Sequence, residues 1–333
     1  MNKLLWLSML LIATESFGAG KEPKLVWPAP PDPARIEYVA SINNAKDFGI
    51  EKGFFSKIVN FVFGDEDPVL NSPFGIDADS NRVYVTDIFA KALYIFDKDE
   101  NEIQQIKGSE KESFLYPVDV VTDKKGNIYV SDSVRAKIYV FDEDGDFQYA
   151  IAPKALQRPV GIAISADGRW LYIVDAMASQ IHVTTLKGNY LHSIGKQGRG
   201  KGEFNRPTFI DVGNDGKIYV SDSMNHRVQI LDKNGKFVHA FGELSDNIGG
   251  FGSPRGIALD SDDNIYVNDT LYNTIQIFNS NGELLMLFGA YGSGKGEFAL
   301  PIDISILADN TIYITDTNNK RFQMFKRLEA PKQ

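Results

Sequence analysis

The stretch PTFIDVGNDGKIYVSD, from Pro207 to Asp222, decides the fold of this chain. It holds two runs rich in β-branched and aromatic residues, and the turn residues Asn, Asp and Gly lie between them. Runs of this kind, bounded by such residues, indicate strands joined as a hairpin. Two further runs follow, HRVQILD and KFVHAFG, with KNG between them. Four strands are therefore expected between Pro207 and Gly242.

The same pattern occurs six times along the chain. The units start 42 to 48 residues apart, at Pro73, Pro117, Pro159, Pro207, Pro254 and Pro301. Four strands in a repeat of this length are typical of a β-propeller, in which sheets stack around an axis. The sequence predicts an all-β fold: a six-bladed β-propeller of four-stranded blades over residues 73–328, followed by a tail at 329–333.

The last unit lacks a fourth strand, and one strand near the other end has no unit of its own. We expect RIEYVASI, residues 35–42, to complete the last blade and close the ring, which removes an open sheet edge. Residues 43–72 then form an insertion. Its stretch KGFFSKIVNFVFG, residues 52–64, predicts a short amphipathic helix. This helix is either a plug on the ring or a docking or membrane-interface element that uses Phe54, Phe55, Ile58 and Phe61.

The N-terminal residues are typical of an exported protein. Lys3 precedes the apolar run from Leu4 to Ala13, and residues 1–19 are predicted to be a signal peptide. The mature chain is expected to be periplasmic or extracellular, without a later membrane span. Residues 20–34 are proline-rich, and we expect either a linker or a strap that runs along a blade through Trp27.

Composition excludes several classes of function. The formal net charge of −9 argues against nucleic-acid binding, which depends on Lys and Arg. The absence of cysteine excludes disulfides, thiol catalysis and covalent haem attachment through C-x-x-C-H.

The repeat resembles the NHL repeat, whose family fold is a six-bladed propeller. Gly256, Ile257 and Ala258 match the start of that motif. Its D-x-x-N-x-R part is matched by Asp222, Asn225 and Arg227, and by Asp316, Asn319 and Arg321. The first three units lack the Asn and Arg. The start V-W-P-x-P-P-D-x-x-R-I is similar to exported bacterial NHL proteins associated with envelope multihaem cytochrome systems. This resemblance implies an accessory role beside such a system.

A glycine-rich stretch, GKQGRGKGEF from Gly195 to Phe204, comes within one residue of a phosphate-binding loop. Gly202 stands where that loop needs Ser or Thr, and a strand is expected next instead of a helix. The stretch recurs as GAYGSGKGEF from Gly289. We therefore interpret both copies as inter-blade turns that bury Phe204 and Phe298.

Two sets of aspartates could be functional. One follows the second strand of every unit, and its repetition favours a structural role in a turn. Its members are Asp87, Asp132, Asp175, Asp222, Asp269 and Asp316. The other set lies on predicted innermost strands and could hold a channel Ca²⁺, or could bind neighbouring backbone instead. Its members are Asp77, Asp119, Asp211 and Asp303.

Histidines do not suggest a zinc site. A propeller lyase of the wider family binds zinc through three His near its axis, but none of the four His here falls on a predicted inner strand. They are His182, His192, His226 and His239.

Basic residues lie next to the starts of three consecutive blades. Arg158 and Arg206 precede the proline of their units, Arg255 follows its proline, and Tyr116 precedes that of the second unit. These residues form an anion- or partner-binding patch at the channel mouth, or the arginines pair with nearby carboxylates.

The sequence favours a non-enzymatic scaffold in the cell envelope. We expect a monomeric propeller that binds a protein partner or ligand and needs no cofactor, apart from the possible Ca²⁺. Two alternatives remain open: a hydrolase, lactonase or lyase with a divalent cation in the channel, and an extracytoplasmic sensor. No nucleophile elbow is present, and no catalytic residue is assigned.

Overall fold

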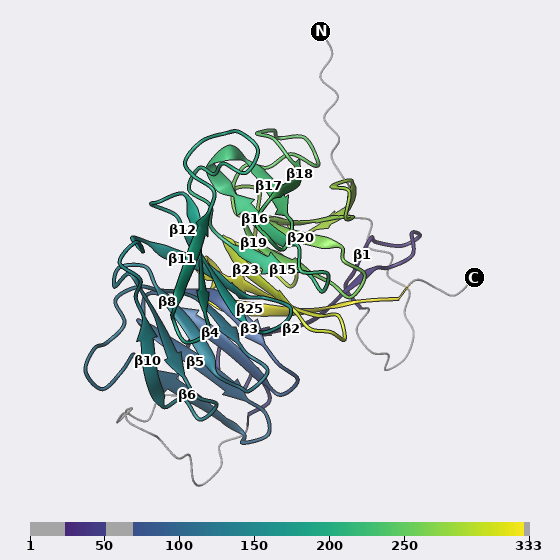
Figure 1. Cartoon of the computed structure of the whole chain (residues 1–333). Coiled ribbons are helices and arrows are strands. Elements are labelled where there is room, and N and C mark those ends of the chain that lie inside the picture. Colours follow the sequence, from purple (N-terminus) through teal and green to yellow (C-terminus); the bar gives the residue numbers. More distant parts are fainter. Residues whose placement is uncertain (1–23, 51–68, 330–333) are drawn as a thin grey trace.

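The computed structural model describes residues 24–50 and 69–329. These residues form six antiparallel sheets and only two short 3-10 helices, η1 (Ser223–Asn225) and η2 (Thr317–Asn319). Each sheet contacts the next through its first strand, and the sixth contacts the first in the same way, so the ring is closed (Figure 1). The predicted six-bladed, all-β propeller is confirmed.

Five blades are formed from consecutive strands. Blade 1 consists of β3 (Pro73–Ala78), β4 (Arg82–Asp87), β5 (Ala92–Asp97) and β6 (Glu102–Ile106). Blade 2 consists of β7 (Pro117–Thr122), β8 (Ile128–Asp132), β9 (Lys137–Phe141) and β10 (Phe147–Ile151). Blade 3 consists of β11 (Pro159–Ile164), β12 (Trp170–Asp175), β13 (Gln180–Thr185) and β14 (Tyr190–Ile194). Blade 4 consists of β15 (Ile210–Val212), β16 (Ile218–Asp222), β17 (Arg227–Leu231) and β18 (Phe237–Phe241). Blade 5 consists of β19 (Pro254–Leu259), β20 (Ile265–Asp269), β21 (Thr274–Phe278) and β22 (Leu284–Phe288).

The sixth blade joins the two ends of the chain. Its first three strands are β23 (Pro301–Ile306), β24 (Thr311–Asp316) and β25 (Arg321–Arg327), and its fourth is β2 (Ile36–Ile42). Strand β2 pairs antiparallel with β25, from Ile36 opposite Arg327 to Ile42 opposite Phe322. Figure 1 shows the two strands side by side, although they come from opposite ends of the sequence. The predicted closure by an N-terminal strand is confirmed.

A fifth strand extends this sheet. Strand β1 (Val26–Trp27) pairs with β2, and the Trp27 ring lies 5.7 Å from the ring of Phe288 and 5.9 Å from that of Phe325. Residues 26–27 thus belong to the sixth blade instead of a free linker, because the indole finds an aromatic surface at the junction of blades 5 and 6.

Trp27→Ala should lower the free energy of unfolding by about 2 kcal/mol, since it removes a half-buried aromatic ring from two ring contacts. Urea denaturation followed by circular dichroism measures this. Val39→Ala, at an exposed position of β2, is the matched control and should change stability by less than about 0.5 kcal/mol. Equal losses in the two variants would contradict the packing role of Trp27.

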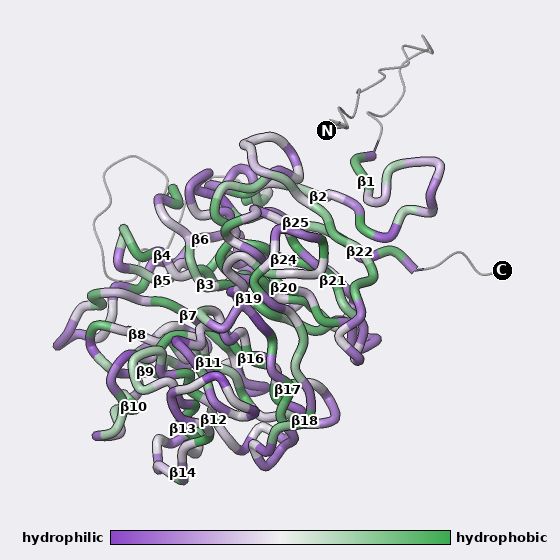
Figure 2. Tube along the Cα trace, turned by 90° about the horizontal axis from the view of Figure 1, so that it is seen from above, coloured by the Kyte–Doolittle hydropathy of each residue, from purple (hydrophilic) through white to green (hydrophobic). Residues whose placement is uncertain are grey.

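The hydrophobic core consists of six clusters, one in each junction between neighbouring blades. Apolar residues of the strands supply these clusters, whereas the turns are hydrophilic, as Figure 2 shows. A blade buries its two faces only against its neighbours, and this explains why the ring must close.

Strand directions define two faces of the ring. We call the end at which the inner strands begin the top face. It carries the turns between the second and third strands of each blade and the connections between blades, because the strands alternate in direction. The other two turns of each blade lie on the opposite end, the bottom face.

The glycine-rich connections lie on the top face and are confirmed as turns between blades. Phe204 and Phe298 are both fully buried. A third connection, Gly242–Phe251, has the same form: its Leu244 bridges to a buried Phe251 as Gln197 bridges to Phe204. Sequence comparison missed this copy because it shares only two glycines, Gly242 and Gly249, and the phenylalanine with the first copy.

The predicted helix at residues 52–64 and the predicted signal peptide lie outside the described residues. Among the residues that are described, no helix has the length and apolar character needed to cross a membrane.

Candidate functional site

The six inner strands approach one another closely around the axis. Glycine stands two residues after the starting proline in blades 1, 3 and 5, at Gly75, Gly161 and Gly256. A Cβ atom at Gly75 would lie 2.4 Å from the Val118 carbonyl oxygen of blade 2, and one at Gly161 would lie 2.5 Å from the Thr208 oxygen of blade 4. These glycines allow the backbones of adjacent blades to meet.

The four inner-strand aspartates all line one cavity in the channel, of about 240 Å³. Each carboxylate accepts a hydrogen bond from a backbone N–H of the next blade around the ring. The pairs are Asp77 with Thr122 at 2.8 Å, Asp119 with Ile162 at 2.8 Å, Asp211 with Leu259 at 2.9 Å and Asp303 with Ile76 at 2.9 Å. The aspartates therefore join four of the six inner-strand junctions.

The four carboxyls lie in two layers along the axis. Asp119 and Asp303 follow their prolines by two residues, whereas Asp77 and Asp211 follow by four. Within residues 24–50 and 69–329, no group of three or more His, Asp or Glu side chains is placed to hold a metal ion. The geometry thus brings the proposed Ca²⁺ ligands into one channel but not into one coordination shell.

Burial raises the pKa of every one of these carboxyls. It raises the pKa of Asp119 to about 7 and that of Asp211 to about 6, and it raises the pKa of Asp77 as well. The pKa of Asp303 is raised well above the ordinary range, first by burial and then by the charge of Asp119. The hydrogen bond between these two carboxyls raises the pKa of Asp303 and lowers that of Asp119, so we assign the retained proton to Asp303.

The raised pKa values of the channel carboxyls predict that the free energy of unfolding decreases from pH 5 to pH 8. An unfolded Asp has a pKa near 3.9, so above about pH 4 the folded chain holds protons that the unfolded chain has released. The contribution of these groups is complete below about pH 4 and is lost as pH rises through the folded pKa values. The slope is about 1.4 kcal/mol per pH unit for each proton retained.

Urea midpoints of the wild type at pH 5, 6, 7 and 8 measure this slope, and Asp303→Asn should flatten it because a neutral amide replaces a protonated carboxyl. Asp309→Asn is the control. The hydrogen bond from Lys326 lowers the pKa of Asp309 to about 2, so it is ionised throughout this range and the slope should not change. A slope that Asp303→Asn leaves intact would contradict the assignment.

Above this cavity, two aromatic side chains meet across the axis at the channel mouth. Phe74 of blade 1 and Phe209 of the opposite blade 4 have ring centroids 6.5 Å apart. Phe74 also contacts Tyr116 of blade 2, at 6.2 Å between centroids. Tyr116 in turn influences Arg255 of the opposite blade 5 electrostatically. The mouth is thus filled by three aromatic rings and one guanidinium.

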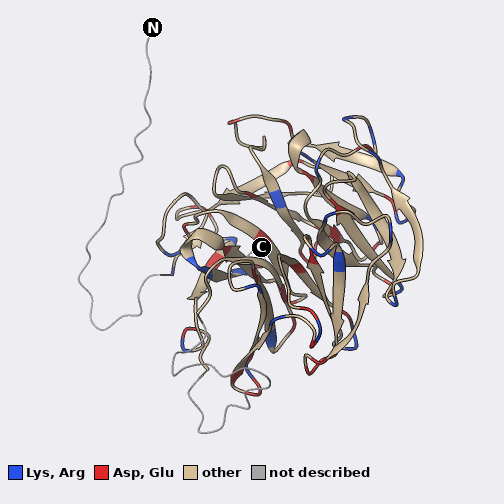
Figure 3. Ribbon diagram, turned by 90° about the vertical axis from the view of Figure 1, so that its left-hand side faces the viewer, with Lys and Arg blue, Asp and Glu red and all other residues tan. Residues whose placement is uncertain are grey.

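Arg158 and Arg206 lie outside this filling and are exposed. Within the described chain, none of the three arginines forms an ion pair, so the alternative that they pair with nearby carboxylates does not describe them. In Figure 3 the Lys and Arg positions are scattered around the ring among Asp and Glu, without one broadly basic face.

The six repeat aspartates are fully buried below the top face. Each carboxylate accepts backbone N–H groups from the segment before its inner strand, and most also accept from the turn that follows. Asp132, for example, accepts from Leu115 at 2.7 Å and from Val134 at 3.1 Å. In blade 4, Arg227 donates from Nε to Asp222 at 2.9 Å and from another nitrogen to the Gly200 carbonyl at 2.9 Å. Asp222 and Arg227 thus tie the glycine-rich connection to the blade.

A ring of exposed apolar side chains surrounds the mouth, and sequence reasoning missed it. It lies two residues after the repeat aspartate in five blades, and every member is more than half exposed: Phe89, Val134, Met177, Met224 and Leu271. We call these five residues the apolar ring. In four of them the backbone N–H donates to the repeat carboxylate at 3.0–3.1 Å, so the buried aspartate fixes the turn that presents the side chain. The sixth blade has exposed Asn318 at this place.

The histidines take no part in the channel. His182 is buried and contacts Asp175 at 3.3 Å and Ser193 at 3.1 Å, and His226 contacts the Gly252 carbonyl. His192 and His239 lie on outer strands β14 and β18. None of the four lines the channel cavity.

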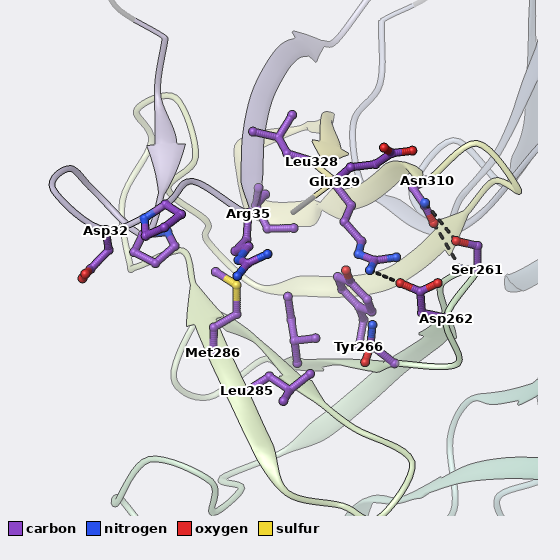
Figure 4. Close-up of a pocket in the computed structure, with 16 residues that line it drawn as sticks. Asp32, Arg35, Ser261, Asp262, Tyr266, Leu285, Met286, Asn310, Leu328 and Glu329 are labelled. Atoms are coloured by element: carbon purple, nitrogen blue, oxygen red, sulfur yellow. Dashed lines mark hydrogen bonds and ion pairs between the residues drawn. The ribbon is translucent and has the colours of Figure 1, made fainter. Parts of the chain in front are cut away.

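A cavity of about 840 Å³ lies on the bottom face between blades 5 and 6. Figure 4 shows Arg35, Tyr266 and Met286 around it. Much of its polar lining is already paired: Arg327 with Asp260 and Asp262, and Asn310 with Ser261. We place the candidate site on the top face because its arginines and apolar side chains have no such partners.

Comparison with known proteins supports the fold. Residues 160–228 and 251–326 match the sequence profile of a family described as a 6-bladed beta-propeller. No curated protein sequence matches.

Solved propellers of diverse function share the architecture. A protein of unknown function from Bacteroides thetaiotaomicron has a TM-score of 0.64 at 14% identity, over 88% of this chain and 75% of that one. An auxiliary nutrient binding protein from Bacteroides ovatus has a TM-score of 0.60 at 14% identity, over 78% and 70%. A virginiamycin B lyase from Staphylococcus aureus has a TM-score of 0.57 at 16% identity, over 78% and 96%. At these identities the likeness establishes the fold alone.

Proposed function

We propose that this chain is a non-enzymatic binding propeller that engages a protein partner through the apolar ring on its top face. The observation that supports this most strongly is the repetition: five turns expose a large apolar side chain at the same position, each beside a buried aspartate. Single exposed apolar residues are common on protein surfaces, but a group gathered on one face is typical of an interaction site.

A protein fits this surface better than a lipid bilayer does. The net charge of −9 opposes adsorption to anionic membranes, which attract basic segments. The ring also surrounds a mouth that combines aromatic rings with an arginine, and aromatic residues and arginine are enriched at protein interfaces.

The cellular location and the associated system are proposed from the sequence. The N-terminal apolar run, the NHL-like motifs and the V-W-P-x-P-P-D-x-x-R-I start favour an exported protein of the cell envelope, accessory to a multihaem cytochrome system. The likeness to an auxiliary nutrient binding protein is compatible with a binding role in this setting.

Site-specific photocross-linking tests the proposed function. Benzoylphenylalanine would replace Phe89 or Leu271 on the top face, and Lys125 or Asn281 on bottom-face turns as matched controls, in cells that make the full chain. The proposal expects one cross-linked protein from both top positions and none from the bottom positions. Equal cross-linking from both faces, or lipid adducts alone at the ring, would overturn it.

A second candidate is an enzyme that works through the channel carboxyls, since Asp119 and Asp303 form a pair with raised pKa values in a cavity. The cavity volume of about 240 Å³ is below the range of about 300–1,000 Å³ that is usual for ligand sites, and its carboxylates already bind the next blade. Metal analysis of the purified protein distinguishes the two: a stoichiometric divalent ion lost in Asp119→Asn would favour the enzyme.

A further inference from the structure

Arg255 occupies an unusual environment for an arginine. It stands directly after Pro254, at the start of inner strand β19, and is partly buried at the channel mouth. Its Nε atom is buried and has no hydrogen-bond partner among the described residues, and no carboxylate there pairs with the guanidinium. Burial lowers the pKa of Arg255, and the Tyr116 hydroxyl acts against that shift. A cation withdrawn from water without a counter-ion is unfavourable unless a ligand supplies the anion.

A second polar group without a partner lies in the same blade. Strand β19 has a bulge between Pro254 and Ile257, and Arg255 and Gly256 in that bulge lie opposite Asn268 of β20. Asn268 is fully buried, yet neither atom of its side-chain amide has a hydrogen-bond partner in the described structure. Two independent groups in this sector therefore retain unused hydrogen-bonding capacity.

The other blades show which hydrogen bond the residue equivalent to Asn268 makes. Thr86, Ser131 and Thr315 occupy the place of Asn268 in blades 1, 2 and 6. Each hydroxyl donates to a backbone carbonyl of the next inner strand: Val118 at 2.9 Å, Val160 at 2.7 Å and Phe74 at 2.9 Å. In blade 4 the equivalent Ser221 is fully buried and its hydroxyl also lacks a partner. The blade-to-blade bond is thus missing on both sides of Arg255.

We propose that Arg255, with Tyr116, binds a carboxylate that an acidic residue of the protein partner inserts into the channel mouth. The guanidinium offers a planar set of donors that matches a carboxylate, and the Tyr116 hydroxyl adds one further donor. Phe74 and Phe209 supply an apolar wall that excludes water and strengthens the charge interaction. This inference rests on the proposed function, because the apolar ring around the mouth is what would position the acidic residue.

Nuclear magnetic resonance of the full chain tests the carboxylate site without knowledge of the partner. The probes are 3-phenylpropionate and its neutral twin 3-phenylpropanamide, observed at the Arg255 Nε–H and at the ring signals of Phe74 and Phe209. The acid should shift the Nε–H signal saturably at millimolar concentration, and the amide should not. Arg255→Met should abolish the response. Arg169→Met, which removes an exposed arginine paired with Asp167 on the bottom face, should retain it.

Two variants guard against loss of the response through misfolding. Arg255→Met should fold normally, because it removes an unpaired, partly buried charge, and Tyr116→Phe offers a second variant that removes only a hydroxyl. An absent response to the acid, or equal responses to acid and amide, would overturn the carboxylate site.

Measurements of partner binding distinguish a failure of this inference from a failure of the proposed function. With the partner captured through the apolar ring, Arg255→Met should weaken its binding about 10- to 100-fold, as truncating one member of a desolvated charge pair does. If ring variants abolish binding while Arg255→Met leaves it unchanged, the proposed function stands and the inserted carboxylate is wrong. If 3-phenylpropionate binds at Arg255 but the partner is unaffected by the variant, the ligand is a small free carboxylate, and the assignment to the partner is overturned.

Discussion

Asp222→Ala should lower the free energy of unfolding by about 3–5 kcal/mol, because it leaves a partly buried guanidinium and several donors without their acceptor. The Asp222 carboxylate is fully buried and accepts from the Asn205 N–H at 2.7 Å, from the Asn225 amide at 2.9 Å and from Arg227 Nε at 2.9 Å. Gln229 donates to the same carboxylate at 3.2 Å. Loss of this acceptor disconnects the second and third strands of blade 4 from the glycine-rich connection before it.

Urea denaturation followed by circular dichroism measures the effect, with two comparison variants. Asp222→Asn keeps an acceptor oxygen but not the ion pair, and it should lose less than Asp222→Ala. Asp215→Ala removes an exposed carboxylate of the same blade that pairs with Lys217, and it should cost no more than about 1 kcal/mol. If Asp222→Ala is as stable as Asp215→Ala, the repeat aspartate does not support the turn.

The triple variant Phe89→Ser, Met224→Ser and Leu271→Ser should weaken partner binding at least about 100-fold, since it removes three apolar contacts of the kind that dominate interfaces. Its stability should change little, because all three side chains are more than half exposed. Titration calorimetry with the cross-linked partner, once purified, measures the affinity.

The matched control is Val238→Ser with Leu285→Ser, two exposed apolar side chains on the outer strands of blades 4 and 5. These substitutions remove exposed apolar surface of the same kind away from the top face, so affinity should stay at the wild-type value. Comparable losses in both variants would mean that general surface hydrophobicity, and not the apolar ring, holds the partner.

The repeat made the fold predictable to a large extent. Six prolines at a regular spacing gave the blades and their order, and the unmatched strand at residues 35–42 gave the closure. Strand β1 was less predictable, since Trp27 joins the sheet only because Phe288 and Phe325 come together from blades 5 and 6. Strand β15 begins at Ile210, later than the sequence pattern suggests, although the Thr208 N–H still donates to the Ser221 carbonyl of β16 at 2.9 Å.

The site was predictable only where the repeat itself points to it. The apolar ring has a sequence signal, an apolar residue two positions after five of the six repeat aspartates, which becomes meaningful once the turns are known to share one face. The pairing of Asp119 with Asp303 and the contact of Phe74 with Phe209 have no such signal. The first joins the two blades on either side of blade 1 and the second joins opposite blades, and the length of the repeat alone does not give those distances.

Hydrogen–deuterium exchange of the complex tests the central claim most directly, because it reports which turns the partner covers on the unmodified chain. The account predicts slower exchange in the top-face turns that carry the apolar ring, residues 87–91, 132–136, 175–179, 222–226 and 269–273. The bottom-face turns at 123–127 and 279–283 should exchange as in the free protein. Protection confined to the bottom face or to the outer strands, with the ring turns unchanged, would contradict it.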